Sequence, residues 1–418
     1  MDWAPQQDAG LVKADRWFKH DTEQQQIFRM FGYAGTGKTT LAKALASGID
    51  GTVLFAAFTG KAAYVLRQKG CAAQTIHSLI YTSRDKGKAQ MLQLEKDLAD
   101  LKEELSKQGK TPTEISLNKR VLDFQKMIRN ENENISQPFF IKNIDSELKH
   151  ASLLIVDEVS MVDQRMGEDL VSFGIPILVL GDPAQLPPVK GSGYFTNGAK
   201  PDVMLTEIHR QAQESGILRF ATDLRQKKAP KIGSYGEDCE ILSIRDVNKD
   251  NVIIPDQLIV GRNATRSAYN HRLRAILGLQ GDRGYEDLPV HGDKVVCLKN
   301  NHEAGLLNGA LFKVEEAGSV YDNKIALEIL PEGEDFTKTV SSHVHHFEGR
   351  SGDLQYWEKK SAEEFDYGYA MTCHKSQGSQ WDHVMTFDES RSFGDNWHLW
   401  SYTAATRAAR KLQWIMMD

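Results

Sequence analysis

The sequence has 418 residues, of which 40% are hydrophobic and 26% are charged, with a formal net charge of −6. This length exceeds one ordinary core and predicts two to four globular domains. No apolar run approaches the roughly 18 residues of a membrane helix, and the N-terminus lacks a signal-peptide layout, so we expect a cytoplasmic protein that does not bind membranes. The negative charge argues against a protein that coats polyanions, but it allows a local groove for nucleic acid.

Neither the cysteines nor the histidines predict a metal site. The four cysteines are scattered and form no C-x-x-C pair, so we expect them to be reduced: Cys71, Cys239, Cys297 and Cys373. Three histidines lie close together, namely His343, His345 and His346. We interpret these as solvated residues of a strand, because no cysteine or acidic ligand stands beside them.

Residues 1–25 are predicted to form a helix, with Pro5 near its start and apolar residues spaced for one face. Gln6 and Gln7 fall in its first turns. A glutamine amide donates and accepts hydrogen bonds at once, as the edge of adenine requires. One of the two is therefore a candidate for reading the base, although a solvated glutamine explains them equally well.

Residues 32–40 fit the phosphate-loop pattern G-x-x-x-x-G-K-[ST] without substitution. Chance would give about 0.015 such matches in this chain. An apolar strand-like run precedes the loop and a helical run follows it, so backbone N–H groups and the helix N-terminus are expected to face phosphate oxygens. Lys38 is predicted to reach the β and γ phosphates of ATP, and Thr39 to hold Mg²⁺. The loop residues assigned to the nucleotide are Gly35, Thr36, Gly37, Lys38, Thr39 and Thr40.

Two further runs place polar residues at element ends. Residues 52–58 read as a buried strand that ends at Thr59, and residues 73–79 carry His77. Ligands of open α/β sheets gather at the carboxyl ends of the strands, so both residues are expected near a bound ligand.

Between residues 83 and 137 the composition shifts to Lys, Glu, Gln and Leu. Two sets of apolar residues are spaced 4, 3, 4, as in a coiled-coil seam: Leu94, Leu98, Leu101 and Leu105, then Leu117, Val121, Phe124 and Ile128. Gly and Pro between the sets predict an antiparallel helical hairpin that protrudes from the globule. A purely structural role for this insertion has equal weight.

The chain then resumes buried strand patterns that end in chemically useful residues. Residues 151–163 lead into Asp157, predicted to hold Mg²⁺ through water, and Glu158, predicted to orient and deprotonate the attacking water. The strand that follows ends near Gln185, whose amide is placed to sense the γ phosphate. A short β-like run precedes Arg210.

The second half repeats the α/β alternation. Residues 256–274 read as strand, turn and helix, whereas residues 285–363 read as a small antiparallel β domain. Residues 400–416 are predicted to be helical, with Arg407 and Arg410 at the start. An arginine that closes on the γ phosphate from a second domain stabilises transition-state charge and makes hydrolysis depend on domain closure, which indicates a motor.

In order, the motifs are PQQDAGL, GYAGTGKTT, AFTGKAA, TIHSL, VDEVSM, GDPAQLPPV, LTEIHR, CHKSQG and YTAATRA. Together they resemble superfamily 1 helicases, and among these the RecD/Dda-like branch of superfamily 1B. The resemblance implies two RecA-like domains with ATP between them and 5′ to 3′ movement along single-stranded DNA. It places Gln7, with Gln6 as the alternative, at the adenine, and Gln377 and Gly378 at the nucleotide. It supports Lys38, Glu158, Gln185, Arg210 and Arg407 as catalytic residues.

The same resemblance implies a set of DNA-contacting residues, which are Thr59, His77, Asn263, Thr372 and His374. Trp357 and Trp381 are further candidates for stacking on bases, with a place in the core as the favoured alternative. Implied partners are single-stranded and tailed duplex DNA, and a replication or single-strand-binding protein fits the same role. We expect a monomer.

The fold class is therefore predicted as α/β, with two RecA-like P-loop NTPase domains. The first comprises 1–82 and 138–190, and the second 191–284 and 364–418. The helical hairpin occupies 83–137, where relatives commonly carry a short β-hairpin pin, and 285–363 resembles their SH3-like insertion.

Three functions remain open. The first is an ATP-dependent 5′ to 3′ DNA helicase that unwinds duplexes. The second is a translocase that displaces proteins without parting strands, because the usual pin is missing. The third is a nucleotide-switched binding module whose hairpin recruits a partner.

Overall fold

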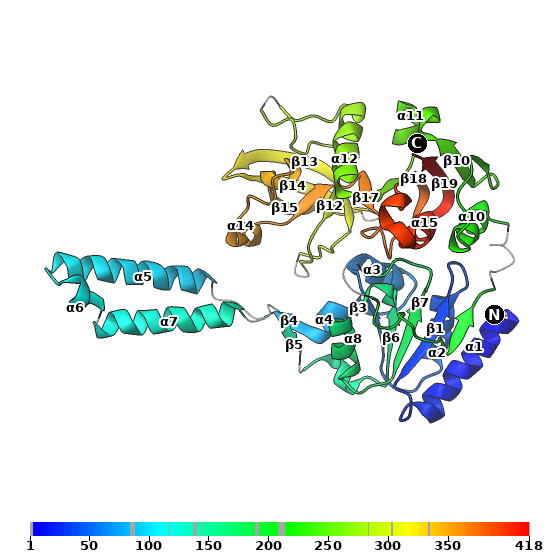
Figure 1. Ribbon diagram of the computed structural model, residues 1–418, viewed down its shortest axis with the longest axis horizontal. Helices are drawn as coiled ribbons and strands as arrows, with labels where there is room; N and C mark the ends of the chain where they lie inside the picture. Colours follow the sequence, from blue (N-terminus) through cyan, green and yellow to red (C-terminus); the bar gives the residue numbers. More distant parts are fainter. Residues whose placement is uncertain are drawn as a thin grey trace. The chain divides into compact units, whose positions relative to one another are not determined.

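The computed structural model describes residues 3–83, 88–116, 118–136, 140–143, 145–188, 192–207, 214–282, 284–301, 304–332 and 335–417. These residues form two compact units, one made of Met1–Leu79 with Glu147–Asp418 and the other of Ile80–Ser146. The larger unit contains three sheets, two of six strands and one of five (Figure 1). Among the described residues, no helix has both the length and the apolar character to cross a membrane.

The first sheet is parallel throughout and has the strand order β3-β2-β6-β7-β1-β8. Its strands are β1 (Ile27–Gly32), β2 (Val53–Ala57), β3 (Ala73–Thr75), β6 (Leu153–Asp157), β7 (Ile177–Gly181) and β8 (Val203–Leu205). The associated helices are α1 (Pro5–Arg16), α2 (Lys38–Ser47), α3 (Gly60–Gln68), α4 (Ile76–Ile80) and α8 (Gln164–Val171). Strand β7 is buried along its whole length, as expected for a parallel strand covered on both faces.

The predicted boundary of the first domain at residue 190 is wrong. Strand β8 pairs in parallel with β1, with Met30 opposite Val203, so the first sheet continues beyond that boundary. A three-residue edge strand carries too little pattern for its pairing partner to be read from sequence.

The second sheet has the order β17-β11-β18-β19-β10-β9, with only β9 antiparallel among its described strands. The strands are β9 (Gly233–Ser234), β10 (Cys239–Ser243), β11 (Gln257–Val260), β17 (Ala370–Thr372), β18 (Trp381–Asp388) and β19 (Ala408–Met416). The helices are α10 (Gly216–Arg225), α11 (Lys249–Ile253), α12 (Asn263–Leu277) and α15 (Trp397–Ala405).

The predicted helix at 400–416 is corrected by this sheet. Helix α15 ends at Ala405, and Arg407 follows it in the connection to β19, an interior strand between β18 and β10. Residues 412–415 are all buried, so burial on both faces of the sheet outweighs a helical spacing of apolar residues.

The third sheet is antiparallel and has the order β15-β14-β13-β12-β16. It consists of β12 (Lys294–Cys297), β13 (Leu311–Tyr321), β14 (Lys324–Pro331), β15 (Lys338–His343) and β16 (Phe365–Tyr367), with short helices α13 (Val344–Phe347) and α14 (Tyr356–Lys360). The small antiparallel β domain is thus present, whereas its SH3-like character stays a prediction. Because β16 pairs with β12, the predicted boundary at 363 is wrong and this sheet extends to Tyr367.

Two of the three histidines near 345 are not solvated, contrary to the prediction. His343 ends β15 and His346 lies in α13, and both are buried. The Nε2 atom of His343 lies 2.8 Å from the Glu358 carbonyl oxygen. Packing of the two short helices on the sheet covers these side chains, which no local sequence pattern reveals.

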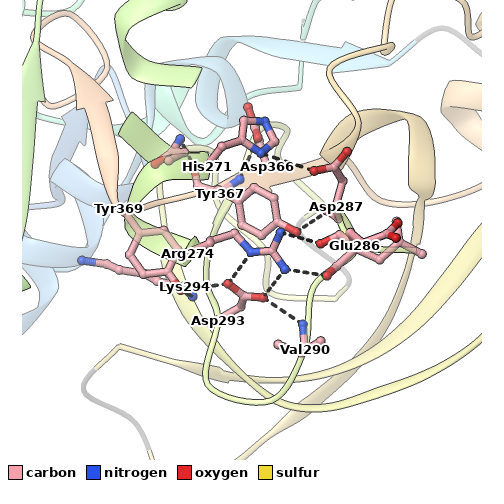
Figure 2. Close-up of polar contacts among 12 residues, drawn as sticks. His271, Arg274, Glu286, Asp287, Val290, Asp293, Lys294, Asp366, Tyr367 and Tyr369 are labelled. Carbon is pink, nitrogen blue, oxygen red and sulfur yellow. Dashed lines mark hydrogen bonds and ion pairs between the residues drawn. The ribbon is translucent and has the colours of Figure 1, made fainter. Parts of the chain in front are cut away.

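A buried ion pair joins α12 of the second sheet to the third sheet (Figure 2). The guanidinium of Arg274 donates from Nε and Nη2 to both carboxylate oxygens of Asp293, at 2.9 and 3.0 Å. Asp293 also accepts from the Tyr369 hydroxyl at 2.8 Å, and Arg274 lies over the Tyr367 ring. The two charged side chains are 3% and 0% exposed. Because the ion pair is bidentate and its side chains make further contacts, it fixes the third sheet to the second.

The smaller unit is the predicted helical hairpin. Helices α5 (Lys88–Lys107) and α7 (Lys119–Ser136) lie side by side, joined through α6 (Pro112–Ser116), with β4 (Tyr81–Ser83) paired to β5 (Phe140–Lys142) at the base (Figure 1). Leu101, Leu105 and Val121 are buried between the helices, with Leu98 and Phe124 beside them. The proposed seam is confirmed at these positions, while Leu117 lies outside the described residues.

The Arg274–Asp293 pair should be costly to break from one side. Arg274→Met leaves a buried carboxylate unpaired and should lower the free energy of unfolding by about 3–5 kcal/mol in urea denaturation. Arg274→Met with Asp293→Leu should recover part of that loss. The exposed pair of Lys228 and Asp223 gives the control, since Lys228→Met should cost no more than about 1 kcal/mol. If Arg274→Met lowered the free energy of unfolding no more than Lys228→Met does, the predicted cost of breaking the buried pair would be wrong.

Candidate nucleotide site

The phosphate loop leaves β1 at Gly32 and enters α2 at Lys38. Gly35 and Gly37 have φ of +76° and +84°, the left-handed region that glycine adopts without a steric cost. A cavity of about 430 Å³ opens beside the loop. Lys38, Thr39, Asp157, Glu158 and Gln185 line it from the first sheet, and Gly378 and Arg407 line it from the second. The structure therefore brings most of the predicted nucleotide residues to one place.

Lys38 is held inside the loop by backbone oxygens. Its Nζ donates to the carbonyl oxygen of Gly32 at 2.7 Å and to that of Tyr33 at 3.0 Å. The ammonium is thus held at the start of α2, where the helix dipole also favours negative charge. Phosphate oxygens could take over these hydrogen bonds without a large movement of the side chain.

Thr39 and Asp157, the two residues predicted to hold Mg²⁺, are in direct contact. The Thr39 hydroxyl donates to Oδ2 of Asp157 at 3.0 Å, and Oδ1 of Asp157 accepts from the Glu158 amide at 2.8 Å. A hydroxyl beside a carboxylate supplies the hard oxygen ligands that fit Mg²⁺. The described residues contain no group of three or more His, Cys, Asp or Glu that could hold a metal.

Glu158 follows β6 in a constrained conformation. Its φ of 54° is left-handed, which is uncommon for a residue with a side chain and often marks a functional position. Burial in the cavity raises the pKa of its carboxyl group, while the nearby Arg407 opposes the rise. A raised pKa is what a general base at this position needs, because the proton it takes must be held.

Two buried glutamines have unpartnered oxygens. Gln185 and Gln377 are 8% and 1% exposed, and within the described residues the Oε1 atom of each lacks a hydrogen-bond partner. Gln377 donates from Nε2 to the carbonyl oxygen of Leu186 at 3.0 Å, which links the second half to the segment after Gln185. An unsatisfied buried amide oxygen is costly, so that of Gln185, which lines the cavity, points to a polar ligand there.

Arg407 is 4% exposed, and among the described residues its hydrogen bonds go to groups of the second half. Its Nε donates to the Thr403 carbonyl oxygen at 3.0 Å, and its Nη1 to that of Ser379 at 3.1 Å. These bonds fix the guanidinium at the cavity wall without neutralising its charge. Arg407 therefore lines the cavity, and its role at the γ phosphate stays a prediction, whereas Arg210 lies outside the described residues.

The structure separates the two candidate adenine readers. Gln7 is 2% exposed and donates from Nε2 to the carbonyl oxygen of Thr36 in the phosphate loop at 3.0 Å, so it is not a solvated glutamine. Gln6 accepts instead from the amides of Thr206 and Glu207, at 2.7 and 2.9 Å. Gln7 is thus the one that reaches the loop, and its role at the base stays a prediction.

The proposed DNA residues differ in exposure. Asn263 is exposed at the first residue of α12. The hydroxyl of Thr59 caps α3 by accepting from the Ala62 amide at 3.1 Å, and Thr372 is buried and accepts from the Lys375 amide. Burial lowers the pKa of His77 and His374, which favours their neutral forms.

Of the two tryptophans, Trp381 belongs to the core of the second sheet, so the core alternative is correct for this residue. The side chain of Trp357 lies outside the described residues. Because the Trp381 ring is buried in this core, it is not available to stack on a base.

Sequence reasoning missed two residues that stand behind the cavity wall, Tyr402 and Asp182. Both lie inside motifs that were recognised, YTAATRA and GDPAQ, but neither was assigned a role. Tyr402 donates to Asp182 at 2.7 Å across the two halves. The only indication in the sequence was that a carboxylate and a phenol occur in these two motifs. Their contact could not be predicted, because it depends on how the two halves pack.

Two family models match the chain, the AAA domain over residues 18–245 and the UvrD-like helicase C-terminal domain over residues 367–414. The ATP-dependent RecD2 DNA helicase of Deinococcus radiodurans is 28% identical over 258 residues, which are 56% of this chain and 32% of that protein. A probable conjugal transfer protein TraA of Sinorhizobium fredii is 27% identical over 290 residues, 62% of this chain and 24% of the relative. The chain thus spans a third or less of these relatives' lengths.

Solved structures share the fold over nearly the whole chain. Bacteroides Pif1 helicase in complex with ADP-AlF3 and ssDNA has a TM-score of 0.52 at 19% identity and covers 100% of this chain and 92% of its own. Pif1 helicase from Candida albicans has a TM-score of 0.51 at 17% identity and covers 99% and 95%. At these identities the likeness shows the fold, which is the predicted α/β arrangement of RecA-like domains.

Since the first model spans more than half of the sequence, the chain belongs to the AAA domain family. The second model and the RecD2 relative agree with the resemblance to superfamily 1B helicases that the motifs carry. The resemblance seen in the motifs is thereby confirmed.

Burial of Glu158 should make the nucleotide-free protein less stable at neutral pH. A folded-state pKa above the unfolded value of about 4.3 means that stability is lost as pH rises between the two values. Glu158→Gln removes the ionisation, so it should raise the Tm at about pH 7.5, and the gain should shrink as pH falls toward about 4.3. The exposed Glu240 gives a matched control, Glu240→Gln, with little change expected. A pH-independent gain would contradict the assignment.

Proposed function

We propose that the chain is an ATP-dependent DNA helicase that moves 5′ to 3′ along single-stranded DNA. The observation that carries this proposal is the shared cavity, where Lys38, Asp157 and Glu158 of the first half face Arg407 of the second. A site made by two halves of the chain can couple hydrolysis to their closure. The two six-stranded sheets are then the centres of the two motor domains.

Each residue of the cavity has a distinct role in hydrolysis. Lys38 binds the phosphates of ATP, and Thr39 and Asp157 hold Mg²⁺, which when bound neutralises charge on the phosphate oxygens. Glu158 orients the attacking water and takes its proton. Gln185 contacts the γ phosphate, and Arg407 and Arg210 stabilise the charge that develops there.

The DNA part of the proposal draws on the relatives. One is named as an ATP-dependent DNA helicase, and the Bacteroides Pif1 structure contains single-stranded DNA. We extend these partners to this chain, with the five residues named from the motifs as the contacts. Tailed duplex DNA as substrate, a single-strand-binding partner, a monomeric state and a cytoplasmic location belong to the same proposal.

The helical hairpin favours a second candidate function. It forms its own compact unit with a packed seam, in the part of the sequence where the resemblance leads us to expect a short pin. A translocase that displaces proteins without separating strands is therefore the alternative. The binding module has less support, because Arg407 lines the cavity as a hydrolysing site requires.

The role of Glu158 gives the first test. Glu158→Gln should lower DNA-stimulated ATP turnover by at least about 10²-fold, because general-base catalysis is worth that much, while nucleotide binding is retained. Turnover is measured by phosphate release and binding with a fluorescent ATP analogue. The Glu240→Gln variant should keep wild-type turnover. Full DNA-stimulated turnover in Glu158→Gln would contradict the proposed mechanism.

Removal of the hairpin separates helicase from translocase. Strands β4 and β5 are antiparallel, with Ser83 opposite Phe140, so deletion of residues 84–136 leaves residues 137–139 to close a short β-hairpin. A helicase that uses the hairpin as a wedge should then lose unwinding of a 5′-tailed duplex and keep DNA-stimulated ATP turnover. Retention of both activities would make the hairpin a docking arm.

A further inference from the structure

Tyr402 crosses from the second half of the chain to the first. It lies on α15, is 2% exposed, and its hydroxyl donates to Oδ2 of Asp182 at 2.7 Å while accepting from the Ala34 amide at 2.9 Å. Burial and the Asp182 carboxylate raise the pKa of Tyr402 well above its ordinary value, so it stays a phenol that can donate. The hydroxyl therefore makes both of its hydrogen bonds across the interface.

One partner of this hydroxyl lies in the phosphate loop, and the other begins the turn that carries Gln185. Ala34 lies in the phosphate loop and lines the cavity. Asp182 follows β7, and its Oδ1 accepts from the Ala184 amide at 3.0 Å, which shapes the turn that carries Gln185. One phenol thus connects the loop and the Gln185 turn of the first half to a helix of the second.

The same helix leads directly to Arg407. The carbonyl oxygen of Thr403 accepts from Arg407 Nε at 3.0 Å, and the Thr403 hydroxyl accepts from the Leu186 amide at 2.9 Å. Any shift of the end of α15 therefore moves the guanidinium. The position of Arg407 relative to the phosphate loop depends on what holds this end of the helix.

We infer that Tyr402 is a positioning residue for ATP hydrolysis, which sets the place of Arg407 by fixing the end of α15 to Ala34 and Asp182. This inference rests on the proposed function, because it assumes hydrolysis in this cavity. It adds a residue that touches neither phosphate nor metal. Loss of the hydroxyl should misplace the arginine without removing it.

Nucleotide binding should survive the loss of the hydroxyl. Lys38 and Thr39 are held by contacts within the first half, and a second contact steadies the loop from the other half, since Arg225 lies 3.4 Å from the centre of the Tyr33 ring. The effect is thus expected in kcat and not in the KM for ATP. A general loosening of the interface would change both.

The test compares full-chain variants in DNA-stimulated ATP turnover. Tyr402→Phe should lower kcat by about 10- to 100-fold, as small misplacements of catalytic groups do, and leave the KM for ATP within about twofold. The control is Tyr235→Phe, which removes a similar hydroxyl bonded to a carboxylate, that of Asp223 at 2.9 Å, away from the cavity. It should keep wild-type kcat.

A double variant tests whether Tyr402 acts through Arg407. If it does, Tyr402→Phe with Arg407→Ala should be no slower than Arg407→Ala alone, because the two residues serve one function. The inference is overturned if the double variant loses the product of the two single losses in kcat. It is also overturned if Tyr402→Phe keeps wild-type kcat. If Tyr402→Phe fails to fold, Asp182→Asn replaces it and should lose less kcat, again with no further loss beside Arg407→Ala.

Amide hydrogen exchange distinguishes a failure of the inference about Tyr402 from a failure of the proposed function. Without nucleotide, the Ala34 amide should exchange faster in Tyr402→Phe than in wild type or Tyr235→Phe. Unchanged exchange would overturn the inference while leaving the proposed function intact. A wild-type chain that hydrolyses no ATP with or without DNA would overturn the proposed function, and this inference with it.

Discussion

Parallel pairing of β6, β7 and β1 is the constraint on which the nucleotide site depends. Neighbouring parallel strands end at the same edge of the sheet, so Asp157, Gly181 and Gly32 are brought together from three distant parts of the sequence. The phosphate loop, the acidic pair and the Gln185 turn each leave the sheet at that edge. Short connections from the strand ends are therefore enough to bring the phosphate loop, the acidic pair and the Gln185 turn to one site.

The nucleotide site needs residues from the second sheet as well as from the first. In the proposed mechanism the first half binds the phosphates, holds the metal and provides the base, whereas Arg407 of the second half stabilises the charge of the transition state. This division makes full assembly of the site depend on the contact between halves, where Tyr402, Thr403 and Gln377 each form a hydrogen bond to the first half. A motor requires such dependence, because hydrolysis that ignored the interface could not drive movement.

The site also carries strain and desolvation that folding alone would not favour. Glu158 has a left-handed backbone, burial raises the pKa of Glu158 and Asp182, and Gln185 keeps an unpaired buried oxygen within the described residues. Such features are expected where a protein is organised for a charged ligand and not for its own stability.

Much of the fold and site followed from sequence because the signals were local. The phosphate loop, the strand ending in Asp157 and Glu158, and the hairpin seam each carry a pattern within some twenty residues, and all three appear as predicted. The misses depended on long-range packing. Edge strand β8, strand β19 read as a helix, buried His346 and the contact of Tyr402 with Asp182 are decided by partners far along the chain. Arg407 lines the cavity although the secondary structure around it was predicted wrongly, because its assignment rested on the motif YTAATRA and not on the element that follows.

The most direct test of this account is ATP turnover with and without single-stranded DNA, measured beside unwinding of matched 5′-tailed and 3′-tailed duplexes. A 5′ to 3′ helicase should show strong stimulation by single-stranded DNA and should open only the 5′-tailed duplex. Absence of stimulation, or opening of the 3′-tailed duplex alone, would contradict it.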